Sequence, residues 1–145
     1  MLKGIPKIIS PELLKVLSEM GHSDTIVIAD ANFPAESIGR GKPVIRADGH
    51  GAAELLSAIL TLFPLDTYVA TPVKLMAVMD GDNVETPIWD EYKKIVKEVG
   101  DMDADAIAEI ERFAFYEEAK NAYAVIATGE SALYANVILQ KGVIA

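Results

Sequence analysis

The sequence predicts an α/β fold of three layers, in which helices cover both faces of a mostly parallel central sheet. Short runs rich in Ile and Val alternate with helix-length segments almost throughout the chain, and this alternation is typical of such sheets. The run Thr25–Ala29 lacks polar alternation, which indicates a strand buried on both faces. The chain has 145 residues, 51% of them hydrophobic, so we expect one domain over residues 1–145 with a substantial core.

The N-terminal part is expected to form a helix followed by two strands. Ser10 can cap the helix and Pro11 suits its first turn, while Gly21 is placed to end it. The buried strand Thr25–Ala29 follows, and Val44–Arg46 is expected to be a second, shorter strand. A turn and a flexible glycine-containing loop separate the two strands.

The rest of the chain continues the alternation. Apolar residues at helical spacing predict helices, and compact apolar runs between turn residues predict strands. The expected helices are 51–62, 87–100 and 113–121, and the expected strands are 73–79, 106–111, 122–128 and 136–140.

Composition excludes several classes of partner. The formal net charge is -9 without a cluster of Lys or Arg, so a nucleic-acid backbone or an anionic membrane surface is a poor partner. The absence of cysteine excludes disulfides and thiolate chemistry. No apolar stretch approaches the ~20 residues that span a bilayer, and no signal-peptide pattern opens the chain. We therefore expect a cytoplasmic protein.

An acidic run resembles the start of a calcium loop but fails to continue as one. Asp101, Asp103 and Asp105 have the required spacing, yet Ala106 stands where the loop needs Gly and Arg112 where it needs Glu. A solvated acidic turn is the better interpretation.

Other motifs for metals, nucleotides and nucleophiles are incomplete. The Gly49–Gly51 stretch lacks the third glycine of a phosphate-binding turn, and His22 and His50 are not paired at ligand spacing. The stretch Thr128–Ala132 lacks both glycines of a serine-nucleophile elbow. The sequence therefore predicts neither a metal nor a cofactor.

Residue types suited to acid–base chemistry and sugar binding lie mostly just outside the expected strands and helix starts: His22, Asp30, Asp66, Arg112, Tyr116, Tyr134 and Asn136. Each also has a purely structural interpretation. His22 could be a structural residue, and Asp30 could form a turn with Asn32. The two tyrosines could be core aromatics with surface hydroxyls, and Arg112 could pair with Glu109 or Glu117. From the residues taken singly, these alternatives stay open.

Taken together, several stretches resemble the family of L-fucose mutarotases and D-ribose pyranases. They run in order through nearly the whole chain: 2–6, 10–14, 20–22, 29–34, 45–49, 64–68, 86–89, 112–117, 127–130 and 133–136. The run Arg-Phe-x-Phe-Tyr-Glu at 112–117 resembles the fucose branch rather than the ribose branch.

The resemblance implies a fold and an activity. Family members have three α/β/α layers and interconvert the anomers of a free monosaccharide without a cofactor, so L-fucose is the expected substrate. They assemble as ring-shaped homo-oligomers, often decamers, with sites near subunit contacts. Two alternatives remain: a D-ribose pyranase activity, and a sugar-binding oligomer without catalysis.

The resemblance also implies roles for particular residues. His22 matches the family's proton donor, and Tyr116 and Asp66 match positions with catalytic roles. The matching sugar-binding positions are Asp30, Met76, Arg112, Tyr134, Ala135 and Asn136. The family's Tyr-Gly-Asn is here Tyr134-Ala135-Asn136. If the family's glycine is needed because residue 135 adopts a positive φ, we expect a different local geometry here, because Ala tolerates a positive φ poorly.

Mutarotation needs an acid at the ring oxygen and a base at the anomeric hydroxyl. Histidine exchanges protons near neutral pH, so His22 is the first candidate and Tyr116 the second, with Arg112 one helical turn before it. The strand between His22 and Asp30 would span roughly 16 Å at ~3.3 Å per residue, too far to share one monosaccharide. Either the strand is shorter or bent, or the chain from His22 folds back, or His22 from one subunit works with Asp30 from another.

Overall fold

The computed structural model describes all 145 residues and is built on one mixed sheet with the strand order β2-β5-β1-β6-β3-β4. The strands are β1 (Thr25–Ala29), β2 (Val44–Ala47), β3 (Val73–Met76), β4 (Ile107–Ile110), β5 (Ala124–Thr128) and β6 (Val137–Gln140). β6 runs antiparallel to its neighbours β1 and β3, and the other pairings are parallel. The expected α/β fold with a mostly parallel sheet is confirmed.

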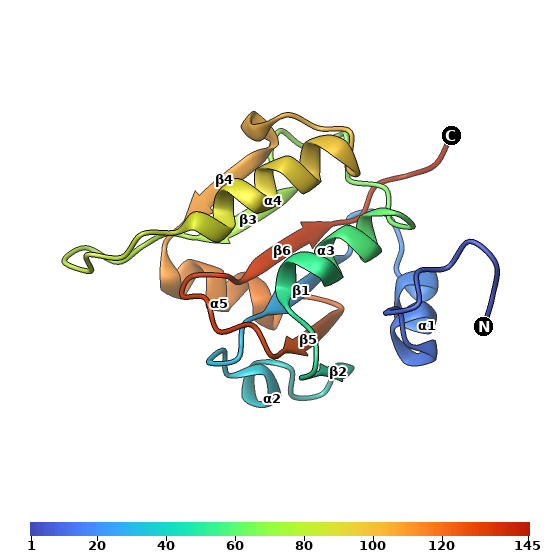
Figure 1. The fold of residues 1–145 in the computed structure, drawn as a ribbon, viewed down its shortest axis with the longest axis horizontal. Coiled ribbons are helices and arrows are strands. Elements are labelled where there is room, and N and C mark those ends of the chain that lie inside the picture. The colour runs from blue at the N-terminus through green and yellow to red at the C-terminus, as the bar shows by residue number, and fades with distance from the viewer.

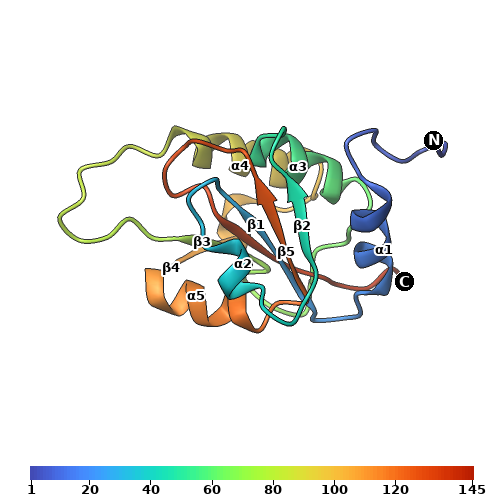
Figure 2. The same ribbon diagram turned by 90° about the horizontal axis from the view of Figure 1, so that it is seen from below.

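Helices cover both faces of this sheet, as the three-layer expectation requires. One face carries α3 (Ala52–Leu60) and α4 (Pro87–Glu98), and the other carries α2 (Ala35–Ile38) and α5 (Arg112–Lys120) (Figures 1 and 2). Helix α1 (Pro11–Glu19) flanks one end of the layers, near both termini (Figure 2). A single 3-10 turn, η1 (Ala104–Ala106), precedes β4.

The central strand β1 is apolar because it packs against two cores. Ile26 and Ile28 belong to the larger core under α3 and α4, while Val27 and Ala29 belong to the smaller core that contains Phe115 of α5. Successive side chains of a strand point to opposite faces, so a strand covered on both faces needs an unbroken apolar run. The interpretation of this run as a doubly buried strand is confirmed.

Several element ends differ from expectation by one or two residues, for example β5 begins at Ala124 instead of residue 122, and three differences bear on the site. β3 ends at Met76 instead of residue 79, because Met76 pairs with Ile110, the last residue of β4, and no partner strand continues beyond. The segment after β3 extends away from the body of the molecule (Figures 1 and 2). The short helix α2 was not expected. Helix α5 begins one residue early, at Arg112, because Glu111 caps its first N–H groups.

Two kinds of feature are absent. None of the helices combines the length and apolar character that a bilayer crossing requires. No group of three or more His, Asp or Glu side chains is arranged to hold a metal ion.

Candidate active site

A pocket of about 280 Å³ opens at the sheet edge where the parallel strands end. Asp30 directly follows β1, Met76 ends β3, and Arg112 follows β4. Asn136 lies at the same edge because β6, which it precedes, runs in the opposite direction. The carboxyl ends of parallel strands meet at one edge, which is the usual place for a ligand site in such sheets.

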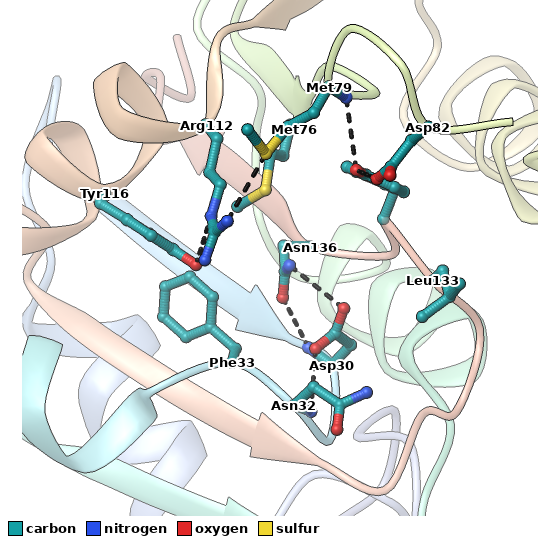
Figure 3. A pocket seen from close by; sticks show the side chains of 11 residues that line it. Asp30, Asn32, Phe33, Met76, Met79, Asp82, Arg112, Tyr116, Leu133 and Asn136 are labelled. Carbon is teal, nitrogen blue, oxygen red and sulfur yellow. Dashed lines mark hydrogen bonds between the residues drawn. The ribbon is translucent and has the colours of Figure 1, made fainter. Parts of the chain in front are cut away.

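Six of the nine residues named from sequence line this pocket: Asp30, Met76, Arg112, Tyr116, Tyr134 and Asn136. Figure 3 shows several of these side chains converging from β3, α5 and the loops at the strand ends. The pocket is also lined by residues that sequence reasoning did not single out as site residues: Asn32, Phe33, Met79, Asp82 and Leu133. Met79 and Asp82 belong to the extended segment after β3, whose path no local sequence pattern reveals.

A buried carboxylate–amide pair forms the floor of the pocket. The Asn136 side chain accepts a hydrogen bond from the Asp30 backbone N–H at 2.7 Å and donates one to the Asp30 carboxylate at 3.1 Å. The Asn32 N–H donates to the other carboxylate oxygen at 3.0 Å, so the turn considered as an alternative role for Asp30 is also present. Burial raises the pKa of the Asp30 carboxyl, against the lowering effect of these donors. Asp30 is therefore a fixed, poorly solvated acceptor suited to sugar hydroxyls.

Arg112 and Tyr116 face each other one turn apart on α5. The Arg112 Nε donates to the Tyr116 hydroxyl at 3.2 Å, and the guanidinium carbon lies 5.4 Å from the phenol ring centroid. This hydrogen bond is also the main reason that the pKa of Arg112 is raised. Arg112 takes part in none of the ion pairs, so the alternative pairing with Glu109 or Glu117 is absent. A cation so placed stabilises negative charge on the phenolic oxygen, which favours proton transfer there.

Aromatic packing holds Tyr116 in place. The Phe33 ring meets the Tyr116 ring edge-on at 5.6 Å between centroids, and it meets Phe115 in a similar way at 6.1 Å. Phe115 is fully buried in the smaller core. The apolar wall of the pocket is thus continuous with the core, and it fixes the direction of the Tyr116 hydroxyl (Figure 3).

The backbone of the segment Tyr134–Asn136 differs from what was expected for Ala135. The positive φ, 56°, falls on Tyr134 and not on Ala135, so the alanine imposes no left-handed strain at residue 135. Ala135 is fully buried and does not line the pocket. The Tyr134 hydroxyl donates to Asp82 and accepts from the Met79 N–H at 3.3 Å. Its hydrogen bond to the Asp82 carboxylate is the main reason that the pKa of Tyr134 is raised.

His22 and Asp66 form a second cluster at the opposite end of β1. The His22 Nε2 lies 3.1 Å from Asp66 Oδ1, which also accepts from the Tyr68 N–H, while the Gln140 amide donates to Asp66 Oδ2. The Tyr68 hydrogen bond is the largest cause of a lowered pKa at Asp66, with Gln140 and His22 adding to it against the effect of burial. Asp66 is 1% exposed, whereas the His22 side chain is 40% exposed.

This arrangement distinguishes the two ring nitrogens of His22. A carboxylate can only accept, so the Nε2 that faces Asp66 is the donor in this pair, and Nδ1 is not engaged by Asp66. Within the chain, however, His22 does not reach the pocket. All five residues Thr25–Ala29 belong to β1, so the strand is not shorter than expected, and no bend or fold-back of the chain brings His22 to the pocket.

Comparisons with known proteins agree with each other. The profile of the RbsD / FucU transport protein family matches residues 3–144. The human fucose mutarotase is 54% identical over 148 aligned residues, covering 99% of this chain and 95% of that protein.

Solved structures give the same result. FucU from Bifidobacterium longum is 67% identical, with a TM-score of 0.96 over 99% of this chain and 100% of that one. The fucose mutarotase of Streptococcus pneumoniae, solved in complex with L-fucose, is 49% identical, with a TM-score of 0.93 over 99% and 100% of the two chains.

Proposed function

Because this chain belongs to the RbsD / FucU transport protein family, we propose that it is an L-fucose mutarotase, which interconverts the α and β anomers of L-fucopyranose. The observation that carries the proposal is the pocket itself. It combines a phenol paired with a fixed cation, Tyr116 and Arg112, with a buried acceptor, Asp30, in a space suited to a small polar ligand. The fold that holds these residues is shared along its whole length with a relative solved with L-fucose.

The proposed chemistry is proton transfer at two oxygens of the sugar. A base removes the proton of the anomeric hydroxyl while an acid protonates the ring oxygen, which opens the ring to the aldehyde. Rotation about the bond to C1 and closure, with the proton movements reversed, gives the other anomer. Each positioned acid–base group contributes roughly 10²–10⁴-fold, and orientation of the substrate adds to this.

Tyr116 and Asp30 are assigned complementary parts. The Tyr116 hydroxyl exchanges one of the two protons, and Arg112 stabilises the charge that appears on it. Asp30 accepts hydrogen bonds from sugar hydroxyls, with Asn136 holding its carboxylate in place. Met76 and Tyr134 contact the remaining faces of the sugar.

His22 supplies the second proton in this proposal, and Asp66 orients it. Because His22 and the pocket occupy opposite ends of β1, His22 of one subunit is proposed to complete the pocket of another. The half-exposed His22 and its neighbour Tyr68, 75% exposed with its ring centroid 5.1 Å away, leave this cluster open to a second chain. We propose a ring-shaped homo-oligomer, a decamer, as the assembly that brings the two clusters together.

A cytoplasmic location belongs to the same proposal. The chain contains no cysteine, whereas small secreted domains are commonly held by disulfides. Fractionation of cells that express the protein tests this point directly.

Saturation-transfer NMR on L-fucose at catalytic protein concentration tests the activity. We expect magnetisation to pass between the two anomeric protons far faster with the protein than without it. Binding of L-fucose without faster exchange would instead support a non-catalytic sugar-binding oligomer. The same measurement on D-ribose, following the pyranose and furanose forms, tests the pyranase alternative, which requires faster exchange on ribose than on fucose.

A further inference from the structure

Helix α4 holds the Tyr134–Asn136 segment through two hydrogen bonds to successive carbonyl groups. The Trp89 indole Nε1–H donates to the Tyr134 carbonyl at 2.8 Å, and the Tyr92 hydroxyl donates to the Ala135 carbonyl at 2.6 Å. Both donor side chains are buried, Tyr92 completely. Neither lines the sugar pocket.

The segment they hold has an unfavourable backbone conformation. Tyr134 has a φ of 56°, in the left-handed region that residues with a Cβ rarely adopt. Such a conformation persists only where the surroundings fix it from several directions. Here the main chain is fixed from the α4 side, while the pocket side holds the Tyr134 hydroxyl through Met79 and Asp82.

The first of these carbonyls belongs to Tyr134 and the second directly precedes Asn136, and both of these residues line the pocket. A shift of the peptide after Tyr134 moves the Tyr134 ring, and a shift of the peptide after Ala135 moves the Asn136 amide away from Asp30. We propose that Trp89 and Tyr92 are positioning residues that set the sugar-binding geometry of Tyr134 and Asn136 from behind the pocket. This inference rests on the proposed function.

The two donors act on binding and not on proton transfer. Arg112 and Tyr116 lie on α5, on the other face of the sheet from α4, and their mutual hydrogen bond does not involve the Tyr134–Asn136 segment (Figure 1). Loosening the segment should therefore weaken the hold on L-fucose and leave the turnover of bound sugar nearly unchanged. The expected signature is a raised KM at an almost constant kcat.

Trp89→Phe and Tyr92→Phe test this separation, since each keeps an aromatic ring and removes one donor. Loss of a single buried hydrogen bond to the segment is expected to raise KM for L-fucose by about 3- to 10-fold, with kcat changed by less than about twofold. Val96→Ala is the matched control. Val96 is fully buried on the same helix and its side chain has no hydrogen-bond donor, so this variant should lower the Tm and leave KM unchanged.

Trp89 also provides a direct spectroscopic readout. It is the single tryptophan of the chain, so its indole N–H gives one assignable resonance. Saturating L-fucose should shift that resonance in the wild-type protein, because the acceptor carbonyl belongs to a residue that contacts the sugar. Tyr92→Phe, which leaves the Trp89 bond in place, should reduce the shift at equal sugar concentration.

The outcomes separate the two proposals. If the wild-type protein does not accelerate anomer exchange of L-fucose, the proposed function is wrong. If it does, but both phenylalanine variants keep the wild-type KM, or lower only the Tm as Val96→Ala does, the positioning role is overturned alone. If the indole resonance of the active wild-type protein does not shift at saturating L-fucose, the positioning role is overturned as well.

Discussion

Complementation between two inactive variants tests whether the active site is shared between subunits. His22→Ala removes the histidine of the cluster at one end of β1, and Tyr116→Phe removes the phenolic hydroxyl of the pocket at the other. Each change deletes one of the two proposed proton-transfer groups, so each variant alone is expected to exchange L-fucose anomers ~10²–10⁴-fold more slowly. His22 is half-exposed and Tyr116→Phe keeps the ring that packs on Phe33, so both variants should fold.

The two variants are then co-expressed in equal amounts with different affinity tags, and oligomers that carry both tags are isolated. If a site takes His22 from one subunit and Tyr116 from another, random mixing leaves about one quarter of the sites with both groups intact. Saturation-transfer NMR should then find roughly one quarter of the wild-type exchange rate per site, far above either parent. A double variant, His22→Ala with Tyr116→Phe, mixed with wild type in equal amounts, serves as the control.

The reasoning predicts a contrast between these mixtures. In a shared site the double variant mixed with wild type also gives about one quarter, because both groups must come from wild-type subunits. If each site is contained within one subunit, the mixture of double variant and wild type gives about one half of the wild-type exchange rate, and the mixture of the two single variants gives only their residual rates. Mixed oligomers of the single variants that stay at the parental level would refute the shared site.

Two further predictions concern stability. The buried carboxylates of Asp66 and Asp30 have pKa values shifted in opposite directions, so they should change stability with pH in opposite ways. The lowered pKa of Asp66 means that its carboxylate stabilises the fold at pH values above its unfolded-state pKa of about 4, and that this stabilisation is lost as the pH falls further. The difference in free energy of unfolding between the wild type and Asp66→Asn should therefore shrink in acid. The raised pKa of Asp30 means that its carboxyl binds a proton more tightly in the folded than in the unfolded state. The free energy of unfolding of the wild type should therefore rise relative to that of Asp30→Asn as the pH falls toward about 4. Urea unfolding at fixed protein concentration from pH 7 to 3 checks both, and equal slopes for the two variants would contradict the assignment. Phe115→Ala should lower the free energy of unfolding by about 3–5 kcal/mol and also slow exchange, because the fully buried Phe115 ring supports the Phe33 wall beside Tyr116. Urea denaturation together with NMR exchange measures both effects, and a loss of stability with an unchanged exchange rate would contradict the supporting role.

Much of the fold could be predicted because local signals and global packing agree. Ser10 accepts the Leu13 N–H as a capping residue, and the apolar run Thr25–Ala29 is the doubly buried β1. Where the prediction was wrong, a tertiary partner decided the outcome. Val78 and Met79 are suited to a strand, yet β3 stops at Met76 because its neighbour β4 ends at Ile110.

The site could be predicted only in part, for a related reason. Asp30 and Met76 end parallel strands, so their meeting at one edge follows from the fold class. Asn136 joins them only because β6 runs in the opposite direction, and the direction of a strand cannot be predicted from its local sequence. Trp89 and Tyr92 look like ordinary core aromatics of an amphipathic helix. Their donors find carbonyl partners more than forty residues away, which no pattern within α4 indicates.

The antiparallel pairing of β1 with β6 also bears on how the protein folds. The strand β6, 137–140, sits between β1 and β3, and it joins the β2-β5-β1 half of the sheet to the β3-β4 half. Just before it, Asn136 holds Asp30; at its far end, Gln140 holds Asp66. Neither cluster can therefore form before β6 has paired with β1. A one-residue slip of this single strand would turn its side chains to the opposite faces and disorganise both clusters at once, so the register of β6 couples the two ends of β1.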